Sequence, residues 1–124
     1  IKGNEELKGY IILKIEEKFN LKIGFIMDII TNSSDVSDTA YQDLLINHAI
    51  FYFKNKKVDV INSIMFPHWK YYSSLKKKKF MKMSKKYFPQ EIYFGARKNN
   101  EEIDIQLIKN PSNWYITWGD TDVV

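Results

Sequence analysis

Cysteine is absent from this sequence of 124 residues, and glycine occurs only five times, each time singly. Without cysteine the chain forms no disulfide, no thiolate zinc site and no cysteine nucleophile. Without clustered glycines it has no glycine-rich loop to cradle a phosphate group. No stretch reaches 18 apolar residues in a row, so the sequence predicts no transmembrane helix. These absences exclude several classes of enzyme and anchor, but they do not indicate a compartment.

Acidic residues are missing from one long stretch, Pro67–Pro89, which carries eight lysines. They are Lys70, Lys76, Lys77, Lys78, Lys79, Lys82, Lys85 and Lys86. Of the 19 basic residues in the chain, these eight leave only 11 to set against 15 acidic ones. One segment therefore gives an otherwise acidic chain its net charge of +4.

Helical spacing places most apolar side chains of this stretch on one side and most lysines on the other. The apolar positions are Trp69, Tyr72, Leu75, Phe80, Met83 and Tyr87. Pro67 suits a first helical turn, and Pro89 would end the helix. Lys76 interrupts the apolar side, so it must extend toward water or the helix must kink. The sequence thus predicts a basic amphipathic helix.

Three roles fit such a helix. It packs against the core with a lysine-rich outer face, it contacts nucleic-acid phosphates, or it meets a membrane surface or an acidic protein. Lysine without arginine favours non-specific charge contact, because base recognition usually relies on the arginine fork.

The N-terminal half alternates between helical and extended patterns. We predict a helix over residues 5–19, although Ile11–Ile15 also fits a strand, and then a strand over residues 21–31. A second helix should begin at Ser34 or Asp35 and end near residues 46–50. Residues 49–66 favour a hairpin turning at Asn55, because they are aromatic and β-branched. The alternative is a second helix that continues through Phe53.

Strict alternation of apolar and polar residues marks the C-terminal third. Residues 92–97, 102–107 and 114–118 are separated by Asn99-Asn100 and by Asn110–Asn113, which suit turns. The prediction is a three-stranded antiparallel meander. The whole chain, residues 1–124, is expected to form a single α+β domain, with helices on one side of a curved antiparallel sheet.

Two further sets of residues suggest binding or catalysis. On the polar face of the meander, Tyr93, Arg97 and Tyr115 could bind a partner by stacking and charge. A histidine pair, His48 and His68, could cleave RNA without metal, one as base and the other as acid. Either histidine alone is more simply explained by packing or surface exposure.

Acidic residues give a weaker signal. Glu102 and Asp104 share a predicted strand face, with Asp59 on another strand, but such spacing is typical of a solvated face. We therefore predict neither a metal site nor a cofactor.

The sequence as a whole favours a non-enzymatic binding domain whose lysine-rich helix contacts an anionic partner: an acidic protein, nucleic acid or a membrane surface. The alternative is a small metal-independent ribonuclease or toxin domain using His48 and His68. Because the chain begins at Ile1 rather than methionine, we expect a fragment or a processed product, and a removed signal peptide or a preceding domain stays open.

Overall fold

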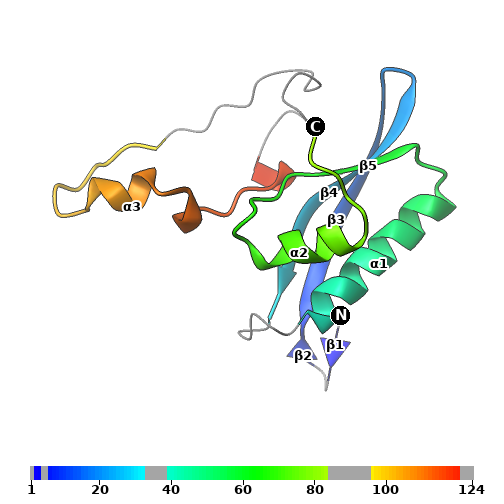
Figure 1. The fold of residues 1–124 in the computed structure, drawn as a ribbon, viewed down its shortest axis with the longest axis horizontal. Helices are drawn as coiled ribbons and strands as arrows, with labels where there is room; N and C mark the ends of the chain where they lie inside the picture. Colours follow the sequence, from blue (N-terminus) through cyan, green and yellow to red (C-terminus); the bar gives the residue numbers. More distant parts are fainter. Residues whose placement is uncertain (1, 4–5, 33–38, 84–95, 121–124) are drawn as a thin grey trace.

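A computed structural model describes residues 2–3, 6–32, 39–83 and 96–120 (Figure 1). The strands are β1 (Lys2–Gly3), β2 (Glu6–Leu7), β3 (Gly9–Lys18), β4 (Leu21–Thr31) and β5 (Val60–Ser63). The α-helices are α1 (Ala40–Asn55), α2 (Lys70–Lys77) and α3 (Ile105–Lys109), and the short 3₁₀ turns are η2 (Pro111–Asn113) and η3 (Trp118–Asp120). The predicted α+β class is confirmed. The sheet β3-β4-β5 is open and mixed rather than purely antiparallel, because β5 runs parallel to β4.

Strand β3 occupies the region where the sequence predicted a first helix, so that prediction is wrong. Ile11, Leu13 and Ile15 pack against the core, while Tyr10 and Ile12, on either side of Ile11, are exposed. This alternation with period two is the pattern of a strand. The same residues also fit the i, i+4 spacing of a helix, but a strand forms because β4 follows directly and pairs with β3 along its length. The predicted strand over residues 21–31 is confirmed as β4.

The turn between β3 and β4 uses Phe19 and Asn20, both at positive φ (54° and 59°). Two-residue hairpins favour this geometry, which glycine and asparagine tolerate and a bulky residue such as phenylalanine does not. We expect the double substitution Phe19→Asn with Asn20→Gly to raise the free energy of unfolding by about 1–2 kcal/mol. Urea denaturation would measure it. Phe19→Ala is the control, since alanine keeps the strain and should change stability little; equal gains from both variants would contradict the explanation.

Strand β4 contains a bulge that changes which side chains face the helices. Ile12 pairs with Asp28 but Leu13 pairs with Ile26, which leaves Met27 as the extra residue. On one side of the bulge Ile26 faces the core, and on the other Ile29 does. The alternation of inward and outward side chains along β4 is therefore broken at Met27.

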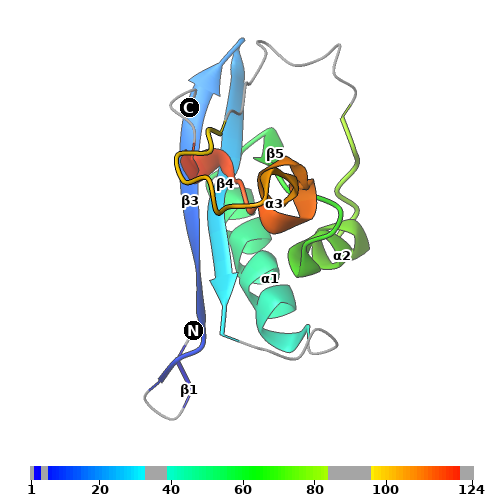
Figure 2. The same ribbon diagram turned by 90° about the vertical axis from the view of Figure 1, so that its left-hand side faces the viewer.

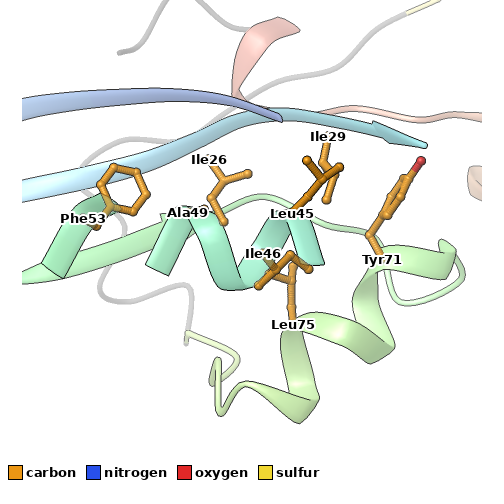
Figure 3. Close-up of a cluster of buried hydrophobic side chains, with 8 residues drawn as sticks. All are labelled: Ile26, Ile29, Leu45, Ile46, Ala49, Phe53, Tyr71 and Leu75. Carbon is orange, nitrogen blue, oxygen red and sulfur yellow. The ribbon is translucent and has the colours of Figure 1, made fainter. Parts of the chain in front are cut away.

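Helix α1 covers one face of the sheet and provides four of the eight side chains in the buried hydrophobic cluster (Figure 3). Its buried side chains follow one stripe: Gln42, Leu45, Ile46, Ala49 and Phe53. The predicted start at Ser34 or Asp35 lies outside the described residues. The helix continues to Asn55, so the predicted hairpin over residues 49–66 is wrong and the alternative of a longer helix is right. Packing of Phe53 against the sheet outweighs the β preference of its aromatic neighbours.

Helix α2 lies on the same side of the sheet as α1, as Figure 2 shows. Gln42 joins the two helices, because its side-chain amide donates to the Lys70 carbonyl (3.0 Å) and to Ser74 Oγ (2.9 Å). On the opposite face of the sheet, η3 packs against β4. The rings of Trp118 in η3 and Phe25 in β4 lie edge to face with centroids 5.5 Å apart.

The predicted C-terminal meander is wrong within residues 96–120, and residues 92–95 lie outside the described part of the chain. Local capping decides the outcome. Asp104 accepts a hydrogen bond from the Gln106 amide (2.9 Å) and begins α3, while Asn110 accepts one from the Ser112 amide (3.1 Å) and begins η2. Residues 114–117 connect η2 to η3. They pair with no strand among the described residues.

Candidate functional site

Helix α2 carries the start of the lysine-rich segment and is anchored firmly to the sheet. The Tyr71 hydroxyl accepts a hydrogen bond from the Thr31 amide (2.9 Å), and Leu75 packs into the core. Lys70, at the first position of the helix, donates to the Thr31 carbonyl (3.3 Å) and lies 5.2 Å from the centroid of the Tyr71 ring. Lys70 therefore helps to attach the helix rather than standing free.

The helix ends at Lys77, so the prediction of one helix to Pro89 is wrong for residues 78–83. The Phe80 amide bonds to the Leu75 carbonyl (3.1 Å) and the Lys79 amide to the Lys76 carbonyl (3.0 Å), with Lys79 at φ 67°. This is a Schellman motif, and Phe80 packs back against the core beside Leu75, as the motif favours. The chain turns at Lys79 although the sequence has no glycine there.

Lys79 occupies a left-handed conformation that side chains other than glycine adopt at a cost. We expect Lys79→Gly to raise the free energy of unfolding by about 1 kcal/mol, because glycine has no Cβ to crowd the carbonyl that follows. Thermal denaturation would measure this. The matched control is Lys78→Gly, one residue earlier at φ −88°, which should not stabilise the protein. If Lys78→Gly raised the free energy of unfolding and Lys79→Gly did not, the assignment of the Schellman motif would be wrong.

Lys77 is tied to α1. Its ammonium lies 3.0 Å from Asp43 Oδ2, which also accepts from the Thr39 hydroxyl (3.1 Å). Partial burial on its own would raise the pKa of Asp43, but the Ser74 hydroxyl, Lys77 and Thr39 outweigh it and hold that pKa below its usual value. Asp43 thus stays ionised at neutral pH and engages Lys77.

The remaining lysines of this region form what we call the lysine surface: Lys76, Lys78, Lys79 and Lys82. All four are exposed. Within the described ranges, none of their ammonium groups makes an ion pair or a hydrogen bond. The lysine surface is a concentration of positive charge that the described part of the protein does not neutralise. Lys85 and Lys86 lie outside the described residues.

Two exposed methionines lie beside the lysine surface; the sequence pattern placed Met83 on the apolar side of the predicted helix and gave Met81 no role. Met81 is 91% exposed and Met83 is 41% exposed, whereas Phe80 between the lysines turns inward. The available signal was that Met81 lies off the apolar side of the predicted helix while standing between Lys79 and Lys82. A large apolar side chain so exposed contributes nothing to the core.

Two of the three residues predicted to bind on the meander lie in the described part of the chain. Arg97 is exposed, Tyr93 lies outside the described residues, and Tyr115 is half-buried. The Tyr115 hydroxyl donates to the Ile29 carbonyl (2.7 Å), and its ring packs 4.7 Å from Trp69. Burial, then the charge of the Asp28 carboxyl group and the ionisable hydroxyl of Tyr71, raise the pKa of Tyr115 well above its usual value. Tyr115 remains protonated and holds the C-terminal segment to β4.

The histidines occupy separate surroundings. His48 is exposed on α1, and His68 is exposed before α2, with its ring 5.3 Å from Phe66 and 5.8 Å from Trp69. No described hydrogen bond or ring contact joins the two. An acid–base pair needs both side chains at one substrate, and the ribonuclease alternative stays a prediction.

Two of the acidic side chains considered as metal ligands accept hydrogen bonds from the backbone in different parts of the fold. Asp104 caps α3, and Asp59 accepts from the Lys22 amide (2.8 Å) at the start of β5. Among residues 6–32, 39–83 and 96–120, no three histidine, aspartate or glutamate side chains gather closely enough to hold a metal ion.

A hollow of about 460 Å³ opens between β3 and residues 117–120 on the sheet face opposite α1. Two carboxylates line it, but each is engaged by the protein itself. Asp28 accepts from the Ile29 amide (2.9 Å) and Asp120 from the Thr117 amide (2.9 Å). The hollow therefore presents no free catalytic pair.

No helix in the described part of the chain is long and apolar enough to cross a bilayer. In comparisons with protein-family models, curated proteins and solved structures, no match to this chain was found.

Proposed function

We propose that this chain is a non-enzymatic binding domain whose lysine surface contacts an anionic macromolecule. The observation that carries the proposal is the exposure of four neighbouring lysines that make no ion pair with the described acidic residues. Like charges repel one another in the free protein, and an anionic partner relieves that repulsion.

Anchoring of α2 supports the proposal, because a rigid platform loses less entropy on binding than a flexible tail. Tyr71, Leu75 and Phe80 fix the helix and the turn after it, so the lysine stems start from defined positions. A competing explanation is that the lysines only offset the negative end of the helix dipole and keep the protein soluble. That explanation predicts no binding.

The test measures binding to labelled single-stranded RNA, duplex DNA, polyglutamate and anionic vesicles across a salt titration. We expect salt-sensitive binding to at least one probe, and a loss of roughly tenfold or more in the variant Lys76→Ser, Lys78→Ser, Lys82→Ser. The control, Lys54→Ser, Lys56→Ser, Lys109→Ser, removes the same charge at exposed positions elsewhere and should bind nearly as wild type. Absence of binding to all four probes at low salt, or equal losses in both variants, would overturn the proposal.

The ribonuclease alternative stays a prediction that the same samples address. The RNA from the titration is run on a denaturing gel. Cleavage that disappears in His68→Ala would replace the binding proposal with an enzymatic one, and intact RNA would leave the binding proposal in place.

A further inference from the structure

We infer that the lysine surface, together with Met81 and Met83, forms a contact surface for bilayers that contain anionic phospholipid. This inference rests on the proposed function and narrows its partner to one kind. It stands on the combination of unpaired positive charge with exposed apolar side chains in a single short segment.

The turn after α2 creates this combination. Phe80 packs against the core next to Leu75, and the Schellman motif fixes the backbone at Lys79. The next residue, Met81, is then left 91% exposed, with Lys79 and Lys82 on either side of it in the sequence. Exposing Met81 to water costs free energy that its transfer to the acyl boundary of a bilayer would recover.

Methionine suits this role because its flexible, unbranched side chain adapts to a disordered apolar surrounding. Lysine suits it as well, because its long stem reaches headgroup phosphates while the apolar neighbours sit deeper. Each lysine near an anionic bilayer raises the affinity by about fivefold, so four lysines supply most of the attraction. Met81 and Met83 would then convert a loose electrostatic contact into one with apolar insertion.

Nucleic acid fits the same surface less well. Proteins that bind single strands stack bases on exposed aromatic rings and often use arginine. Here the segment Lys76–Met83 has no arginine, and its one aromatic residue, Phe80, packs inward. The apolar side chains that are exposed are methionines, which offer a base nothing to stack on.

The absence of cysteine allows a direct test of insertion. Met81→Cys, labelled with a dye that brightens in apolar surroundings, is mixed with vesicles of phosphatidylcholine alone or with about one third phosphatidylserine. We expect brightening only with phosphatidylserine, and loss of the signal at high salt. The control is Leu107→Cys on α3, another exposed apolar position, which should not respond. Equal responses at both positions, or none at Met81, would overturn the inference.

Co-sedimentation with the same vesicles separates the two contributions. Met81→Ser with Met83→Ser should lower vesicle affinity by roughly tenfold. The same variant should leave any RNA or DNA binding unchanged, because nucleic acid does not need the methionines. If the wild-type protein ignores phosphatidylserine vesicles but binds RNA, DNA or polyglutamate through its lysines, this inference fails and the proposed function stands. If it binds none of them, both fail.

Discussion

Gly24→Ala should destabilise the protein by about 2–3 kcal/mol, despite the general advantage of alanine over glycine within a strand. A Cβ at Gly24 would meet two carbon atoms of the Phe53 ring at 2.6 Å. Phe53 is fully buried, so its ring has no free space into which to withdraw. The end of α1 would have to lift away from β4. Urea denaturation followed by far-UV circular dichroism would measure the change.

A double-mutant cycle with Phe53→Leu tests the cause. The smaller side chain should lower stability by itself, but in that background Gly24→Ala should cost less than about 1 kcal/mol, because the contact has been removed. An undiminished cost in the Phe53→Leu background would mean that the ring is not what excludes a side chain at Gly24.

Gln42→Glu should destabilise the protein by roughly 3 kcal/mol at neutral pH. Gln42 is only 2% exposed, and its amide donates to the Lys70 carbonyl and to Ser74 Oγ. A carboxylate at this position cannot donate to the carbonyl, and it would be buried against that oxygen. The pKa of the new glutamate should therefore rise in the folded state.

The sign of the pH dependence follows from that shift. Since the folded protein would hold the proton more tightly than the unfolded chain, the variant should recover stability relative to wild type as the pH falls toward about 4, and lose it as the pH rises. Gln42→Met is the matched control, since it also removes the donor but adds no charge. Its deficit should be smaller and independent of pH. Parallel pH profiles for the two variants would contradict the explanation.

Residue composition and turn residues allowed parts of the fold to be predicted from the sequence. The strand over residues 21–31 and the α+β class were predicted, because β4 is rich in β-branched and aromatic residues and lies between turn residues. For β3 two periodicities coincided. Leu7, Ile11 and Ile15 fit a helix row, and Ile11 and Ile15 also fit a strand face. Only pairing with β4, which a local pattern does not encode, resolves that ambiguity.

Long-range packing explains the larger errors. The aromatic run before Asn55 favours a strand, yet it completes α1 because Phe53 fills the space above Gly24. In the C-terminal third, the alternation around Ile105 had no neighbouring strand to pair with in the described structure, and the Asp104 cap favoured a short helix instead.

The sequence predicted the positive charge of the candidate site but not its backbone conformation. A lysine-rich segment was evident from composition, and the exposure of Lys78, Lys79 and Lys82 agrees with its expected polar side. Lys76, which the helical spacing placed on the apolar side, is exposed as well. The end of the helix at Lys77 was not foreseen, because the left-handed turn falls on a lysine rather than on glycine. That turn is what leaves Met81 exposed.

The two-residue connection between β3 and β4 has a consequence for the order of folding. These strands are adjacent in sequence and can pair within microseconds, whereas β5 joins β4 only after a loop of nearly thirty residues has closed and α1 has docked. We expect folding to begin at the hairpin and to end with β5. Substitutions at Phe19 and Asn20 should then change the refolding rate, while substitutions at Ile61 should mainly change the unfolding rate, as stopped-flow measurements would show.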